Sequence, residues 1–189
     1  MANRSYLYST NIKPRMDGEN CKITGISEFA YEIPIIHRIL ISCEMEACES
    51  SIWERDDKIA LIGDYSEGVE ALKQFFKAIK NPEAKPLIDE ALEFLDKPEN
   101  INKYFILEAG EIYDYEGEDY EGQNLNTLKS IKENLSNEIA LALENINTKS
   151  DGLFKKLFGK KQKTNSDPLE VYYMLGLGGW SNILYYGEA

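Results

Sequence analysis

The chain has 189 residues, and its 33 acidic residues outnumber its 21 basic ones, which gives a formal net charge of -12 at pH 7. A hydrophobic fraction of 43% and a charged fraction of 29% fit one globular domain spanning residues 1–189, and are unlike a disordered chain or a membrane protein. The negative charge argues against general nucleic-acid binding, because neutralising phosphates takes clustered Lys and Arg side chains.

The cysteine and histidine content limits which disulfides and metal sites the chain can form. Cys21, Cys43 and Cys48 cannot build a disulfide framework, and they suit a reducing cytoplasm. The single histidine, His37, lies in an almost wholly apolar run, so a histidine in the core is favoured and zinc sites with several histidines are excluded. No secretory signal and no apolar run of about 18 residues is visible. We therefore expect a cytoplasmic protein without a membrane span, and no cofactor is indicated.

The first half of the chain predicts two strands and one helix. Residues 4–10 alternate between two faces, as a short strand does, and the polar stretch 13–25 reads as a loop. Pro34 suits the first turn of a buried helix over about 33–43. The continuous apolar run 58–63 ends at a glycine and predicts an interior strand.

The middle of the chain predicts a helical connection between two strands. Asp64 and Glu67 have capping-box spacing at the start of a helix that runs to about Lys80. A second helix over 85–95 and a strand over 104–107 follow. We expect strand, two helices and strand to form a crossover unit in a mixed sheet.

The last third predicts one long helix and a final strand. Apolar residues recur every three or four positions from Asn124 to Asn147, which favours an amphipathic helix packed on the sheet, with self-pairing in a homodimer as the alternative. Residues 176–186 read as a turn and a strand. The whole predicts an α+β fold, a small mixed β-sheet covered by several helices including one long amphipathic helix.

A basic segment interrupts this acidic chain at about 150–167. It holds five lysines and no acid between Leu153 and Thr164, with apolar residues interleaved. A flexible excursion that folds back on the acidic body is favoured, and docking to a membrane surface or an anionic partner is the alternative.

Residues 108–121 form the most unusual segment, with seven acidic residues, three tyrosines and no base. Tyrosines give contact area at a small cost in conformational entropy, while carboxylates orient and accelerate the encounter with a basic surface. This composition predicts a protein-binding face, and an ordinary solvated loop is the alternative. The residues predicted to contact the partner are Glu111, Tyr113, Asp114, Tyr115, Glu116, Glu118, Asp119 and Tyr120.

Other chemistry has weaker support in the sequence. Asp114, Glu116 and Glu118 alternate and supply oxygen ligands, but the EF-hand spacing for calcium is absent. A carboxylate pair of the kind used in glycoside hydrolysis stays open, because the two acids need only meet in space. A carboxylate- or metal-dependent enzyme of unknown substrate is therefore the alternative function.

Four segments, residues 3–9, 58–65, 92–114 and 176–186, together resemble an uncharacterised family of bacterial proteins of about this size. The resemblance runs from end to end and implies no activity or catalytic residue. The chain is also similar in style to the immunity proteins of bacterial polymorphic-toxin systems. That resemblance implies a stoichiometric mechanism, in which a cytoplasmic protein-binding module covers the active face of a basic toxin.

Overall fold

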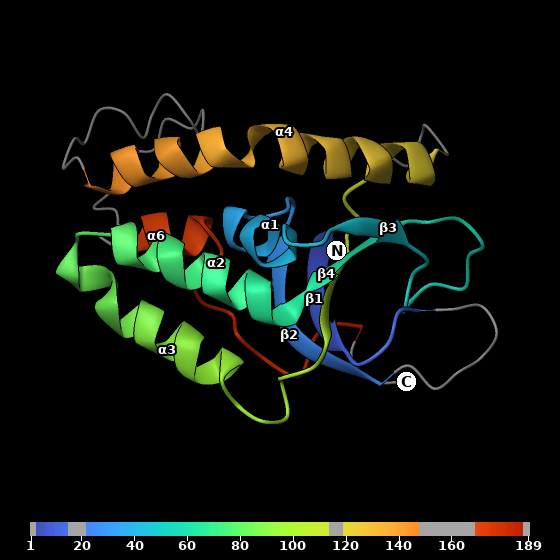
Figure 1. The fold of residues 1–189 in the computed structure, drawn as a ribbon, viewed down its shortest axis with the longest axis horizontal. Helices are drawn as coiled ribbons and strands as arrows, with labels where there is room; N and C mark the ends of the chain where they lie inside the picture. Colours follow the sequence, from blue (N-terminus) through green and yellow to red (C-terminus); the bar gives the residue numbers. More distant parts are fainter. Residues whose placement is uncertain (1–2, 15–21, 114–118, 148–168, 187–189) are drawn as a thin grey trace.

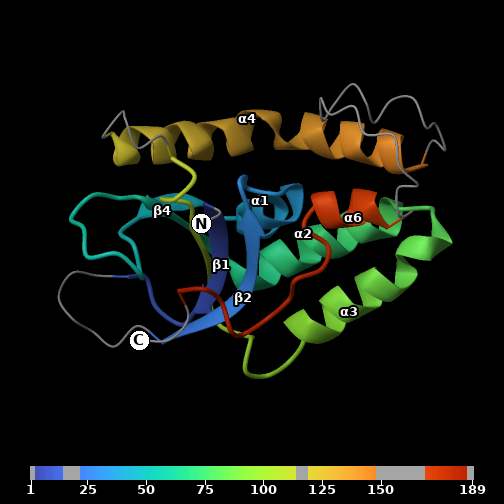
Figure 2. The same ribbon diagram turned by 180° about the vertical axis from the view of Figure 1, so that it is seen from behind.

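The computed structural model describes residues 3–14, 22–113, 119–147 and 169–186 (Figures 1 and 2). In these residues one sheet has the strand order β2-β1-β5-β4-β3. Its strands are β1 (Arg4–Thr10), β2 (Ile23–Ala30), β3 (Glu46–Cys48), β4 (Ala60–Asp64) and β5 (Tyr104–Glu108). The helices are α1 (Ile35–Ile41), α2 (Tyr65–Ala78), η1 (Pro82–Ala84), α3 (Lys85–Leu95), α4 (Tyr120–Asn147) and α6 (Glu170–Met174). The predicted α+β class is confirmed.

Strand alternation gives the sheet two different faces. Leu7, Leu61 and Leu107 are neighbours across β1, β4 and β5, and they belong to the main core together with the helices. On the second face Tyr8, Ile106 and their neighbours form a smaller cluster, to which Ile52 and Leu184 add apolar surface. Helix α4 runs along one side of the molecule, over α1 and the β3–β4 edge (Figure 1).

Helix α2 begins as the sequence predicts. The Asp64 side chain accepts a hydrogen bond from the backbone N–H of Glu67 at 2.9 Å, which satisfies a free donor in the first turn. Close packing against α1 depends on Gly68, because a Cβ there would overlap the carbonyl oxygen of Leu40. The backbones of the two helices therefore meet directly at this point, which only glycine allows.

The mixed character predicted for the sheet is wrong, because the described strands all pair in antiparallel fashion. In a crossover unit, the chain would leave β4 at one end of the sheet and would enter β5 from the opposite end. Instead α2 leads away and α3 leads back, so that β5 starts where β4 ends and Tyr104 pairs with Asp64. Two helices of similar length return the chain to the end it left, whereas one helix would have delivered a parallel strand.

Other elements differ from the predictions in the loops and at the C-terminus. β2 begins within the stretch 13–25 predicted as loop and continues over residues to which no strand was assigned, and β3 is a short strand that the sequence did not suggest. The predicted turn is present, since Gly176, Gly178 and Gly179 adopt positive φ angles, but the predicted final strand is reduced to one bridge between Ser27 and Trp180. The predicted basic segment at 150–167 lies outside the described residues.

None of the helices in the described part of the chain is long and apolar enough to cross a membrane.

Candidate partner-binding site

Half of the residues predicted to contact a partner can be located. Asp114, Tyr115, Glu116 and Glu118 fall outside the described residues, so the prediction stays untested for them. The structure places the other four around the end of β5 and the start of α4. These are Glu111, Tyr113, Asp119 and Tyr120.

Tyr113 has a structural role. Its side chain is only 7% exposed, and its hydroxyl donates a hydrogen bond to Oδ1 of Asn124 at 2.7 Å. Burial raises the pKa of the Tyr113 hydroxyl. Tyr113 therefore fastens the residues after β5 to α4, and it has little surface to offer a partner.

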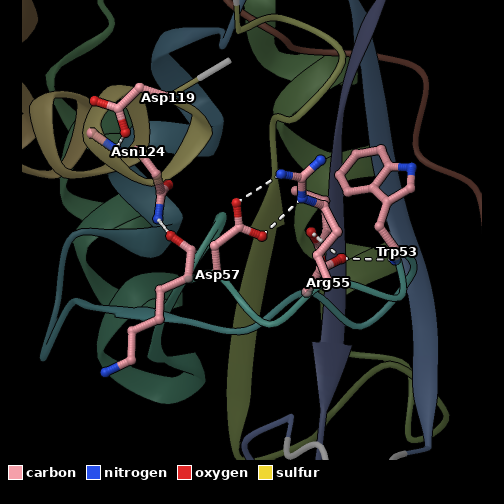
Figure 3. A network of polar contacts seen from close by, with 9 residues as sticks. Trp53, Arg55, Asp57, Asp119 and Asn124 are labelled. Atoms are coloured by element: carbon pink, nitrogen blue, oxygen red, sulfur yellow. Dashed lines mark hydrogen bonds and ion pairs between the residues drawn. The ribbon is translucent and has the colours of Figure 1, made fainter.

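Asp119 and Tyr120 form the start of α4, which Figure 3 shows from close by. Asp119 is exposed, and its Oδ1 accepts a hydrogen bond from the backbone N–H of Gly122 at 2.9 Å. The half-buried ring of Tyr120 lies beneath the guanidinium of Arg55, at 4.7 Å from its centroid. This contact joins the predicted segment to the loop between β3 and β4, residues 49–58, which the sequence analysis did not select.

Arg55 is held by its own loop as well as by Tyr120. Its guanidinium makes two hydrogen bonds to the Asp57 carboxylate, at 2.8 and 2.9 Å (Figure 3). This pairing holds the pKa of the Asp57 carboxyl below its usual range. One of the two bases in loop 49–58 is thus neutralised locally, whereas its neighbours Glu54 and Asp56 are exposed.

Both ends of loop 49–58 are fixed to the rest of the molecule. At the far end, the Asn124 side-chain amide donates to the carbonyl oxygens of Lys58 and Ala60, at 2.8 and 2.9 Å. At the near end, Glu108 accepts hydrogen bonds from the hydroxyls of Ser50 and Ser51, at 3.0 and 2.8 Å, and from the Ser51 backbone N–H at 2.6 Å. The loop is therefore tied to β5 and to α4.

Glu108 has no surface through which to reach a substrate. It is fully buried, and desolvation raises the pKa of its carboxyl to about 7, although the three hydrogen bonds from Ser50 and Ser51 act in the opposite direction. A carboxyl that titrates near neutrality is often a general acid or base, but such a group has to touch a reactant. Its enclosed position indicates that Glu108 positions loop 49–58.

These contacts bring two acidic stretches of the sequence onto one surface. We call this surface the acidic face and define it by the acids of residues 54–57 and of the α4 start. They are Glu54, Asp56, Asp57, Asp119 and Glu121. The bases among the same residues are Arg55, which is paired with Asp57, and Lys58. The run of acids at 54–57 was visible in the sequence, but only the fold shows that it lies beside α4.

The alternative of a carboxylate or metal enzyme can be examined at a hollow of about 280 Å³ at the β3–β4 edge. Two of its three acids already have structural partners, since Glu46 pairs with Lys13 and Asp64 caps α2, while the third, Glu44, is exposed. In the described ranges, no group of three or more His, Cys, Asp or Glu side chains could hold a metal ion. No observation at this hollow selects a reaction.

Fold and surface together define a small acidic α+β protein with carboxylates from two distant segments on one face. The chain belongs to the family named for a domain of unknown function, DUF7822, whose profile matches residues 11–149. The matched range includes loop 49–58 and the start of α4. No curated protein and no solved structure matches the chain.

Proposed function

We propose that this chain is a cytoplasmic protein-binding module that holds a basic partner on its acidic face, in the stoichiometric manner of an immunity protein that neutralises a bacterial toxin. The observation that carries the proposal is the union of loop 49–58 with the start of α4. Asn124 and the Arg55–Tyr120 contact hold these two stretches together, and Glu108 fixes the other end of the loop to β5.

Electrostatics support a basic partner. A loop whose two ends are fixed keeps its carboxylates close together on one surface, and their summed potential accelerates the approach of a basic partner. The net charge of -12 adds a field of the same sign. Attraction of this kind weakens as salt screens it, over a Debye length of about 10 Å at 0.1 M ionic strength.

A charge reversal on the acidic face tests the proposal. Glu54 and Asp56 are exposed, and in the described part of the chain neither makes a hydrogen bond or ion pair, so the double variant E54K/D56K leaves the fold's own contacts intact. The matched control is E90K/E93K, which makes the same change in net charge on exposed positions of α3. Figure 1 shows α3 at the opposite end of the molecule from loop 49–58.

The assay is affinity capture from a lysate of the native host, with wild type and both variants as bait. We expect wild type and the α3 control to retain one basic protein at one-to-one ratio. We expect E54K/D56K to retain it about tenfold less strongly at low salt, with a flatter salt dependence. Equal retention by both double variants, or no basic protein on any bait, would contradict the proposal.

A further inference from the structure

The C-terminal residues 181–186 lie against the second face of the sheet and are fixed there by hydrogen bonds. The Tyr8 hydroxyl donates to the carbonyl oxygen of Tyr186 at 3.1 Å, and the Tyr185 backbone N–H donates to Oε2 of Glu28 at 2.9 Å. Leu184, between these contacts and the sheet, is buried. The last tyrosines are therefore held in defined positions.

Tyr186 is the centre of an aromatic cluster. Its ring contacts those of Tyr6, Trp53 and Tyr185 at centroid separations of 5.5, 6.0 and 5.3 Å, with interplanar angles of 77°, 72° and 88°. Tyr6 is fully buried, but Tyr186 and Tyr185 are 42% and 54% exposed. We call Trp53, Tyr185 and Tyr186 the aromatic corner.

Acidic side chains lie next to these rings. Oε2 of Glu111 accepts hydrogen bonds from the Tyr6 hydroxyl and the Arg4 backbone N–H, at 3.1 and 2.9 Å. The Arg4 guanidinium pairs with Glu28 at 3.2 Å and lies 5.3 Å from the centroid of the Tyr185 ring. The chain thus already packs one guanidinium on a tyrosine beside a carboxylate.

Trp53 connects this cluster to the acidic face. It belongs to loop 49–58 and directly precedes Glu54, and its ring covers Gly110, where a Cβ would approach the ring to 2.8 Å. A protein lying on the acidic face therefore reaches the aromatic corner along the same loop.

We propose that the aromatic corner anchors an arginine or lysine side chain from a basic segment of the partner, with Glu111 as the neighbouring counter-charge. This inference rests on the proposed function and names the place where the partner is held. Aromatic faces attract cations, and exposed tyrosine and tryptophan rings are the residues that most often dominate a protein interface. Charge complementarity selects a cationic segment over an apolar or acidic one.

The test uses the full chain with a Trp180→Phe substitution, which leaves Trp53 as the only tryptophan. The probe is a capped Gly-Arg-Gly-Arg-Gly peptide, and its control is the same peptide with neutral citrulline in place of arginine. We expect saturable changes in Trp53 fluorescence with the arginine peptide alone. Equal binding of the citrulline peptide would overturn the assignment of a cation.

Two variants then test whether the peptide binds at the aromatic corner. Tyr186→Leu removes an open ring, and Glu111→Gln removes the charge but keeps an acceptor for the Arg4 N–H. Each is expected to weaken peptide binding about threefold. The matched control is Tyr173→Leu, on α6, whose side chain is 44% exposed and outside the corner, and it should bind like the parent. Circular dichroism checks that each variant is folded.

The outcomes separate this inference from the proposed function. If E54K/D56K loses the captured protein but Tyr186→Leu and Glu111→Gln bind the peptide like the parent, the anchor is refuted and the proposed function stands. If light scattering instead shows a doubled mass that Tyr186→Leu abolishes, the corner is a contact between two copies of this chain and the inference is overturned.

Discussion

The buried carboxyl of Glu108 should make stability depend on pH in a way that one substitution removes. Its pKa is raised to about 7 in the folded protein, from an ordinary value of 4.5. The native state therefore keeps a proton that the unfolded chain has already lost. The contribution of Glu108 to the free energy of unfolding is therefore fully present below pH 4.5 and is lost as the pH rises through about 7. In Glu108→Gln this dependence disappears.

The expected size follows from the two pKa values. Each unit of difference corresponds to about 1.4 kcal/mol, so the free energy of unfolding should fall by about 2 kcal/mol between about pH 5.5 and about pH 8 because of Glu108 alone. Gln keeps the acceptor that faces Ser51. Its amide meets the Ser50 hydroxyl oxygen, which already accepts from the backbone N–H groups of Ile52 and Trp53. That mismatch costs about 1 kcal/mol at every pH and does not alter the slope.

Urea unfolding followed by tryptophan fluorescence measures the effect. Wild type and Glu108→Gln are compared at both pH values and constant ionic strength, above the pI of about 4.6. Glu93→Gln, an exposed position on α3, controls for the loss of one surface charge. If the difference between wild type and Glu108→Gln is the same at both pH values, the carboxyl is ionised throughout the window, and the argument that burial outweighs its three hydrogen bonds is refuted.

Three further substitutions probe the same fold by urea unfolding. His37 is fully buried, neither ring nitrogen has a hydrogen-bond partner in the described part of the chain, and burial lowers its pKa to about 3. Because the unfolded chain binds a proton below pH 6.5 and the folded one does not, wild type loses stability as pH falls from 6.5 toward 3. His37→Leu should remove that loss, gaining about 1.4 kcal/mol more at pH 5.5 than at pH 8, and an equal gain at both would contradict it. Gly68→Ala should cost about 2 kcal/mol or more, since its Cβ overlaps the Leu40 carbonyl, and a neutral result would show that α1 can move away. Tyr31 has a φ of 70°, so Tyr31→Gly should gain about 1 kcal/mol, and a loss would mean that its side chain stabilises the fold.

Local patterns predicted most elements of the fold. Residues 4–10 and 85–95 form the predicted strand and helix, and the spacing of Asp64 and Glu67 located the start of α2. Strand direction was not available from such patterns, since it depended on how far α2 and α3 carry the chain before it re-enters the sheet. β3 has only three residues, too few to show a period.

The candidate site was predictable in composition but not in geometry. The sequence marked residues 108–121 as acidic and rich in tyrosine, yet Tyr113 is inside the protein, where Asn124 in the second turn of α4 accepts a hydrogen bond from its hydroxyl. The exposed rings beside loop 49–58 are those of Tyr185 and Tyr186, which the sequence predicted to lie in a final strand. They meet Trp53 and Glu111 only because the C-terminal segment crosses the second face of the sheet.

Hydrogen–deuterium exchange on the complex with the captured basic protein would locate the bound surface on this chain. The account predicts that backbone amides of loop 49–58 and of the first turn of α4 exchange more slowly in the complex, while those of the α2–α3 hairpin are unchanged. Protection confined to α2 and α3, with loop 49–58 exchanging as in the free protein, would show that the partner binds elsewhere.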